Sequence, residues 1–421
     1  MKTRGTDEIK ADYEQAKKTY AAWGVDTEKA LARMAERSIS IHCWQGDDVA
    51  GFESEGPLSG GIATTGNHPG KARNWGELKA DLEKALSLIP GQHRVNVHAL
   101  YANGGKADRD QQKPEHFRPW IDWAKAQKVK LDFNGSFFSH PKAADGLTLS
   151  HPDASIREFW IRHAQAAREI GEAMGRELGS PSVVNLWIPD GSKDLPVDRL
   201  SPRKRLKDSL DAAFAKKTDP KHMKDAVECK LFGIGSESYV VGSHEFYLGY
   251  ALRNKVMPCF DMGHFHPTES VADKISSTLL WADELLLHVS RGVRWDSDHV
   301  VLLGDELRLL AEEITRCDAW SRVNFALDYF DASINRIAAW AVGARSAMKA
   351  ILISHLEPIE ALREAEKKGN FGRRLALVEA NKALPFGAVW DKFCLDKGVP
   401  HEQACLESID EYEASVLSKR K

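Results

Sequence analysis

The sequence lacks several features that would assign it to a common class of protein. Its 421 residues carry a formal net charge of -3, and no block of lysine and arginine alternates with aromatic residues. A nucleic-acid partner is therefore not expected, because binding to a phosphate backbone depends on such basic surfaces. No apolar run approaches the length of a membrane span, and the N-terminal segment MKTRGTDEIKADYEQ is too polar for a signal peptide. We therefore expect a cytoplasmic enzyme, without membrane association, that acts on a small neutral substrate.

Cysteine is scarce, and its spacing excludes two further classes. None of the six cysteines forms a CxxC pair, which argues against both a thiolate zinc site and a disulfide framework. We expect reduced, partly buried thiols at all six positions, which are Cys43, Cys229, Cys259, Cys317, Cys394 and Cys405.

Short β-rich runs and helical patterns alternate along the chain. Helical spacing of apolar residues is seen, for example, in 75–89, 155–178 and 304–320. Such alternation favours a parallel sheet, and eight repeats favour closure into an α/β fold of the (β/α)8 TIM-barrel type, with an open doubly wound sheet as the alternative. The eight runs are 38–44, 93–101, 129–138, 182–190, 228–235, 256–263, 284–290 and 322–331.

The remaining segments flank the predicted barrel. Residues 1–37 read as an N-terminal helical lead-in of two helices interrupted at Gly24, and 346–421 as a C-terminal helical extension. The barrel domain would then cover 38–345.

A long glycine-rich connection, 46–74, follows the first run and has no clear periodicity. Connections of this length are uncommon unless they are lids or binding loops, so we expect a lid or an arm between subunits. Its apolar members Val49, Phe52, Leu58 and Ile62 would pack at a subunit interface, with Phe52 or Ile62 reaching a neighbouring active site. The alternative is a loop folded onto its own barrel.

Polar side chains that bind metals are dense between residues 260 and 299. Such groups are rarely buried unless they are paired or bound to a cation, so a shared divalent metal is the simplest explanation. N-caps or surface ion pairs are the alternative for any single residue. The residues are Asp261, His264, His266, His288, Asp296, Asp298 and His299.

Four successive runs supply oxygen and nitrogen ligands but no sulfur. These ligands, Glu228, Asp261, His288 and Asp328, suit Mn²⁺, Mg²⁺ or Co²⁺ better than a structural zinc. A second cluster, with Asp296 and Asp298 one strand period apart, would allow two ions in each subunit. Chemistry of this kind suits hydrolysis and isomerisation equally.

A family resemblance separates these two reactions. Long strings in the expected order resemble L-rhamnose isomerase along nearly the whole chain. The resemblance implies a (β/α)8 barrel, a homotetramer, Mn²⁺ dependence and interconversion of L-rhamnose and L-rhamnulose. The strings are HCWQGDD (42–48), GNHPGKARN (66–74), LDFN (131–134), WIPDG (187–191), CKLFGIG (229–235), GHFHPTE (263–269), RWDSDHVV (294–301) and DASINRIAAW (331–340).

The same resemblance implies roles for single residues. It makes Glu228, Asp261, His288 and Asp328 ligands of a first, substrate-orienting metal, and His264, Asp296 and Asp298 ligands of a second, catalytic one. Lys230 would lie beside the reactive end of the sugar, and His98 near its ring oxygen. Cys229 and Met262 stand where the family suggests smaller residues, and both neighbour predicted ligands.

Each role has an alternative. Lys230 could form an ion pair, and His98 could be a core histidine. Trp44, Phe133 and Trp187 are expected in the pocket wall, because sugars present apolar C–H faces to aromatic rings. His266 and His299 are left open between ligand support and capping. For the reaction we expect a hydride shift between C1 and C2, with an enediol route, a broader preference for other aldoses, and a two-metal barrel hydrolase as alternatives.

Overall fold

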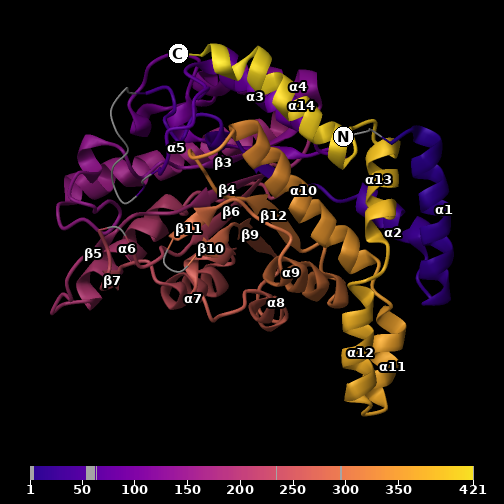
Figure 1. Cartoon of the computed structure of the whole chain (residues 1–421). Coiled ribbons are helices and arrows are strands. Elements are labelled where there is room, and N and C mark those ends of the chain that lie inside the picture. Colours follow the sequence, from indigo (N-terminus) through magenta and orange to yellow (C-terminus); the bar gives the residue numbers. More distant parts are fainter. Residues whose placement is uncertain (1–3, 54–61, 63, 234, 294–295, 421) are drawn as a thin grey trace.

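The fold is a barrel of strands surrounded by helices, with further helices at both ends of the chain (Figure 1). The computed structural model describes residues 4–53, 62, 64–233, 235–293 and 296–420, and within these it leaves out the side chains of residues 296–298.

Eight parallel strands close the barrel in the order β1-β12-β9-β8-β6-β4-β3-β2. The closure confirms the (β/α)8 prediction over the open-sheet alternative. The strands are β1 (Ser40–His42), β2 (Arg94–His98), β3 (Lys130–Asn134), β4 (Ser182–Leu186), β6 (Met223–Glu228), β8 (Met257–Asp261), β9 (Leu285–Val289) and β12 (Val323–Leu327).

The fifth barrel strand lies earlier in the sequence than predicted. The predicted run was 228–235, but the strand is Met223–Glu228 and ends where the run was expected to begin. Sequence patterning missed it because the strand carries charges. Asp225 is paired at 2.7 Å with Arg168 of the earlier helix Ala154–Leu178, so its charge is neutralised where the strand meets a helix. The correction places Glu228 at the carboxyl end of the strand.

The predicted helices between strands form with recognisable start signals. The side chains of Asn74, Asp153 and Asn335 each accept a hydrogen bond from a backbone N–H in the first turn of the helix that follows. The helices around the barrel are α3 (Trp75–Leu86), α4 (Arg118–Gln127), α5 (Ala154–Leu178), α6 (Leu200–Ala213), α7 (His244–Asn254), α8 (Ala272–Leu279), α9 (Asp305–Arg316) and α10 (Arg336–His355).

Helix α10 is the most apolar of these, and its length and composition alone would allow it to cross a membrane. Most of it is buried inside the protein, as expected of a core helix. The Trp340 indole N–H donates to the backbone carbonyl of His42 at 2.8 Å, which ties α10 to the carboxyl end of β1.

Both ends of the chain are helical, as predicted. Helix α1 packs against α13 beside the barrel, and α11 and α12 form a projecting hairpin (Figure 1). The division at 38 and 345 stays a prediction, and its second boundary falls inside α10. The terminal helices are α1 (Thr6–Ala22), α2 (Thr27–Ala35), α11 (Ile359–Lys367), α12 (Phe371–Asn381), α13 (Phe386–Asp396) and α14 (Glu402–Ser415).

The described part of the glycine-rich connection packs on its own barrel. Val49 is buried, and the Phe52 ring meets the Tyr101 ring edge-to-face at 5.4 Å. Ile62 also packs against the main core, whereas Leu58 lies outside the described residues. These contacts favour the alternative of a loop folded onto its own barrel over an arm between subunits.

Candidate active site and metal centre

Four predicted ligands meet at the carboxyl ends of the barrel strands. Glu228, Asp261 and His288 lie on β6, β8 and β9, and Asp328 directly follows β12. One ligand atom from each lies within 4.8 Å of those of the others. The His288 Nδ1 atom is 3.1 Å from a Glu228 oxygen and 2.9 Å from an Asp328 oxygen. The parallel barrel therefore brings together groups that are a hundred residues apart in the sequence.

The electrostatics of this cluster favour a cation. Burial, together with the charges of Glu228 and Asp328, raises the pKa of Asp261 well above its usual value. One Asp261 oxygen accepts hydrogen bonds from the Gly263 N–H and the Ser290 hydroxyl, both at 2.7 Å. The other oxygen is buried and has no hydrogen-bond partner among the described residues. A divalent ion would satisfy that oxygen and offset the repulsion between the carboxylates, so the residues fit the expected metal.

His288 carries the positive charge of the cluster when no metal is bound. Burial lowers its pKa, but the charges of the Glu228 and Asp328 carboxylates outweigh burial and raise it well above the usual value. Burial raises the pKa of Asp328, and the facing imidazole of His288 outweighs it, lowering that pKa to about 2. Metal binding would release the His288 proton, because only neutral imidazole ligates.

Cys259 also lies within ligand distance of Glu228 and His288. Burial raises the pKa of the Cys259 thiol, so the thiol stays protonated and is a poor ligand. The oxygen and nitrogen set remains the better candidate.

The predicted second cluster is described only in part. His264 ends the 3-10 helix η6 (Met262–His264), and its Nδ1 atom is 3.3 Å from a Glu228 oxygen. Asp296 and Asp298 lie on strand β11 (Asp296–His299), which pairs antiparallel with β10 (Arg291–Val293) and packs against η6. The side chains of both aspartates lie outside the described residues. The backbone thus places this hairpin beside His264.

A row of rings forms one side of the site. The Trp44 ring lies 4.6 Å from the His98 ring, which lies 5.5 Å from Phe138. Phe138 in turn lies 6.2 Å from Trp187, and the Lys230 ammonium sits 5.6 Å from the Trp187 ring. Predicted pocket residues from four different strand ends therefore form one continuous surface.

Two of these residues have surroundings that bear on their chemistry. Burial lowers the pKa of His98 to about 3, so its imidazole is neutral near pH 7. Its Nδ1 atom is 3.2 Å from the Ser136 hydroxyl, and its Nε2 atom is 3.4 Å from the Asn134 side-chain nitrogen. The Trp44 indole N–H donates to Asp328 at 3.2 Å and links the row of rings to the metal cluster.

Phe133 does not belong to this row, which corrects its predicted place in the pocket wall. Asp132 and Asn134 face the barrel interior, so the residue between them points outward, toward the helices. Phe133 there packs edge-to-face on Phe117 at 5.0 Å. Phe138, beyond the end of β3, supplies the ring instead. The strand period, counted from Asp132, could have revealed this.

His42, to which the sequence assigned no role, lies against the row of rings, 5.3 Å from the Trp44 ring. It ends β1, is fully buried, and lies 4.4 Å from the Tyr329 ring. Burial lowers its pKa to about 3, and both ring nitrogens have no hydrogen-bond partner among the described residues. Its position as the polar end of the first strand is the signal that could have identified it.

The two histidines left open by the sequence do not belong to the four-residue cluster. His266 is exposed and its Nδ1 atom is 2.7 Å from the Thr268 hydroxyl in the same turn. His299 lies opposite Arg291 in the backbone register of the β10–β11 hairpin.

Comparison with known proteins identifies the family of the chain. The sequence profile of the family described as L-rhamnose isomerase (RhaA) matches residues 7–420. The chain is 56% identical over 414 residues to an L-rhamnose isomerase of Rhodopirellula baltica, covering 98% of this chain and 97% of that protein. It is 55% identical over 417 residues to an L-rhamnose isomerase of Salmonella paratyphi B, covering 99% and 100%.

Among solved structures, a D-psicose 3-epimerase from Clostridium cellulolyticum matches with a TM-score of 0.46 and 13% identity, over 76% of this chain and 98% of that one. The profile and the relatives, which span nearly the whole sequence, carry the assignment. The chain belongs to the L-rhamnose isomerase family.

Proposed function

We infer that the chain interconverts L-rhamnose and L-rhamnulose, an isomerisation between an aldose and a ketose. Family membership supports the reaction, and one structural observation carries it to this chain. The four-residue cluster of Glu228, Asp261, His288 and Asp328 lies at the carboxyl rim of the barrel beside a row of rings suited to a sugar.

We propose Mn²⁺ as the natural cofactor, with Mg²⁺ or Co²⁺ as substitutes. Glu228, Asp261, His288 and Asp328 would hold one ion, and His264, Asp296 and Asp298 a second. When bound, such ions polarise the carbonyl and hydroxyl oxygens of the open-chain sugar and lower the pKa of a coordinated hydroxyl or water. The oxygen-rich donor set and the unpartnered Asp261 oxygen support this assignment.

Lys230 and His98 would act on the two ends of the sugar. The ammonium of Lys230 is buried over Trp187, where a fixed positive charge would orient the carbonyl end of the open chain. The imidazole of His98 is neutral, so its ring can exchange hydrogen bonds with the ring oxygen of the closed sugar and take part in ring opening.

Trp44, Phe138 and Trp187 would cover the apolar faces of the sugar and keep water away from the reacting carbons. Under this shield we propose that hydride passes between C1 and C2 while the hydroxyl proton moves between O2 and O1. An enediol route would instead exchange a carbon-bound hydrogen with solvent. Isomerisation in deuterated water separates the two, because substantial deuterium at C1 or C2 at low conversion would exclude the hydride route.

The test of the activity itself is direct. The protein incubated with Mn²⁺ and L-rhamnose should form the ketose, and the same protein treated with a chelator should not. Absence of ketose, or hydrolysis of a phosphate or glycoside substrate instead, would overturn the proposal. Rates with other aldoses would measure how broad the preference is.

The second metal has its own test. Asp296→Asn combined with Asp298→Asn should abolish turnover and leave the thermal unfolding midpoint close to that of the wild type, because β11 lies outside the barrel strands. Near-normal turnover in the double variant would remove these residues from the catalytic site. Glu228→Gln, in comparison, should weaken both sugar binding and rate.

We also propose a homotetramer located in the cytoplasm. The projecting hairpin supports assembly, because Phe371 and Leu375 of α12 are 58% and 65% exposed within one subunit. Light scattering should give the mass of four chains, and the variant Phe371→Ser with Leu375→Ser should give a smaller assembly.

A further inference from the structure

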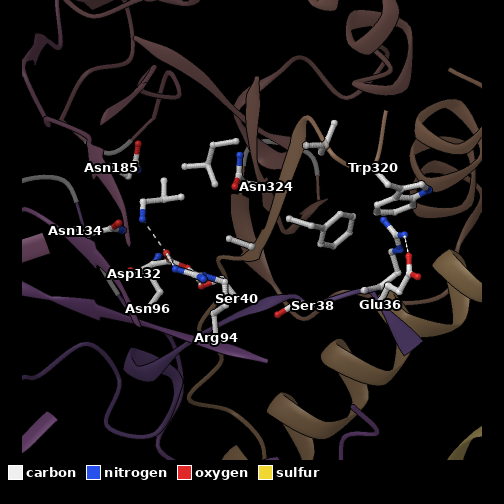
Figure 2. Close-up of a pocket in the computed structure, with 16 residues that line it drawn as sticks. Glu36, Ser38, Ser40, Arg94, Asn96, Asp132, Asn134, Asn185, Trp320 and Asn324 are labelled. Atoms are coloured by element: carbon white, nitrogen blue, oxygen red, sulfur yellow. Dashed lines mark hydrogen bonds and ion pairs between the residues drawn. The ribbon is translucent and has the colours of Figure 1, made fainter. Parts of the chain in front are cut away.

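The lower half of the barrel interior, toward the amino ends of the strands, contains a polar cavity of about 210 Å³. Barrels of this type are ordinarily filled by layers of branched apolar side chains. Here apolar side chains such as Leu286 and Phe325 share the lining with asparagines from three adjacent strands, namely Asn96 on β2, Asn134 on β3 and Asn185 on β4. Figure 2 shows Asn134 and Asn185 at one side of the cavity and Trp320 and Glu36 at the other.

The charged residues of this cavity are already paired. Asp132 accepts two hydrogen bonds from the Arg94 guanidinium, at 2.7 and 2.8 Å, and one from the Ser40 hydroxyl at 2.6 Å. The other two charged residues that line the cavity, Glu36 and Arg37, form an ion pair at 3.0 Å. Because these charges are paired, the cavity offers no net charge to an ion. Its recognition chemistry is that of neutral hydrogen-bonding groups.

Three buried acceptors remain open. The side-chain oxygens of Asn96, Asn134 and Asn185 have no hydrogen-bond partner among the described residues, and these side chains belong to residues only 3%, 5% and 2% exposed. An unsatisfied buried amide costs free energy comparable to a lost hydrogen bond. A polar cavity of this size holds several water molecules, which can donate to all three oxygens.

The cavity also touches the catalytic end of the barrel. The Asn185 side-chain nitrogen donates to a Glu228 oxygen, and the Asn134 nitrogen is 3.4 Å from the Nε2 atom of His98. Each amide thus directs its nitrogen to a site residue and leaves its oxygen for the cavity. The orientation of the two amides, and hence of Glu228 and His98, depends on what binds their oxygens.

The cavity reaches solvent beside the seam between β1 and β12, because its lining includes the exposed residues Glu36 and Ser38. Strands β1 and β12 share one register pair, Ser40 with Ala326, whereas β9 and β12 share five. The cavity reaches the unpaired part of this seam, where the Arg37 guanidinium lies over the Trp320 ring at 5.7 Å. Water can therefore enter from the face opposite the sugar site.

We propose that this cavity is a hydrated chamber whose ordered waters complete Asn96, Asn134 and Asn185 and hold the two amides that position Glu228 and His98. The positioning half of this proposal rests on the proposed metal site, whereas the hydration half does not. Asn134 and Asn185 are in this view positioning residues.

A crystal structure of the Mn²⁺-loaded protein at high resolution tests the hydration. Ordered waters should lie within hydrogen-bond distance of all three asparagine oxygens. An empty chamber, or asparagines rotated to bond with one another, would overturn the proposal.

The direction in which Asn96→Leu shifts the thermal unfolding midpoint is a second test of the hydration. Leucine has the same number and branching of side-chain heavy atoms as asparagine, and it removes one acceptor from the chamber. If water satisfies that acceptor, the midpoint falls; if the chamber is dry, the midpoint rises, because an unsatisfied buried amide has been removed. Asn96→Ser, which keeps a polar group and adds room for water, is the matched control and should lower the midpoint less.

The positioning role is read from Mn²⁺ affinity, which is independent of isomerase activity. Asn185→Leu should raise the Mn²⁺ dissociation constant at least about tenfold, as for other groups that hold a metal ligand. Asn96→Phe fills the chamber without touching Glu228 and should raise the constant several-fold, and Asn96→Ser should leave it unchanged. An unchanged constant in a folded Asn96→Phe variant whose crystals show the waters displaced would overturn the positioning role. Chamber waters in a protein that lacks isomerase activity would instead refute the proposed function alone.

Discussion

Asp132 and Asp261 are both buried carboxylates on barrel strands, yet their surroundings are opposite. Asp132, in the lower half of the barrel, accepts hydrogen bonds from Arg94, Ser40 and the backbone N–H of Val183. Asp261, at the carboxyl rim, has one oxygen without a partner and faces other carboxylates.

The difference between these two aspartates distinguishes a structural carboxylate from a metal ligand. A carboxylate that stabilises the fold has its charge neutralised by the protein, because an unpaired buried charge is costly. One that serves a metal keeps a place open for a cation. Burial and residue type are the same for both, so only the partners separate them.

The largest expected effect is on activity. Asp261→Asn should lower kcat/KM by about 10³-fold, since loss of a metal ligand removes several kcal/mol of transition-state stabilisation. The unfolding free energy of the metal-free protein should stay at or above the wild-type value, because the change removes repulsion among carboxylates. Steady-state kinetics and chemical denaturation measure the two quantities. A variant with normal kcat/KM would show that Asp261 is not a ligand.

Asp132→Asn should have the opposite profile. It leaves the half-buried Arg94 without its charge partner but with hydrogen bonds to the Leu131 and Pro181 carbonyls, so the unfolding free energy should fall by about 1–3 kcal/mol. At a temperature where the variant remains folded, Mn²⁺ affinity should be retained. Denaturation in urea with a metal titration on the same sample provides the check. Loss of Mn²⁺ binding by a folded Asp132→Asn variant would contradict the view that Asp132 serves the fold and not the metal.

The two aspartates should also differ in how much added Mn²⁺ stabilises the variants. At a Mn²⁺ concentration about 100 times the dissociation constant, binding should stabilise the wild type and Asp132→Asn by about 2.7 kcal/mol. Asp261→Asn should gain almost nothing at that concentration. Thermal unfolding with and without a chelator measures this difference, and equal stabilisation of all three proteins would place the metal elsewhere.

The smallest expected effect is on stability, depends on pH, and comes from the surface carboxylate Glu177. Glu177 on α5 is paired with Arg118 and Lys125 at 2.6 and 2.7 Å, and hydrogen bonds from these two cations lower its pKa to about 2. The pKa of this carboxyl is lower in the folded protein than in the unfolded chain, where it is about 4.3, so the ionised carboxylate stabilises the fold above that pH. This stabilisation is lost as the pH falls toward 2.

After solvent screening the Glu177 contribution should be about 0.5–1 kcal/mol. Glu177→Gln should therefore cost that amount at pH 7 and progressively less between pH 4.5 and 2, in a comparison of unfolding free energies with the wild type. A cost that does not change with pH would mean that the charge of Glu177 is not the source of the stabilisation.

The barrel and most of the rim could be predicted from the sequence because both depend on periodicity and chain order. Alternating apolar runs and helices indicated the closed barrel, and polar residues late in these runs indicated Asp261, His288 and Asp328. Glu228 was expected at the start of the fifth run, and the structure places it at the end of β6. The row of rings was predicted at Trp44 and Trp187. Parallel strands that end at one rim convert sequence position directly into proximity.

What could not be predicted depends on local pairing. Strand β6 was placed too late because its charge at Asp225 is neutralised by Arg168, a contact invisible in the sequence. Phe133 was assigned to the wrong side of β3, and Phe138 takes its place. The neutral network around Asp132 was also missed, since a buried aspartate and its distant arginine are not linked by any spacing.

The central claim is that a metal binds among Glu228, Asp261, His288 and Asp328. Anomalous diffraction at the manganese absorption edge, from crystals of the protein with Mn²⁺, tests it most directly. We predict a strong anomalous peak within bonding distance of all four side chains, and its disappearance in Asp261→Asn but not in Asp132→Asn. A fully occupied Mn²⁺ peak elsewhere in the protein, with none among these four residues, would contradict the account.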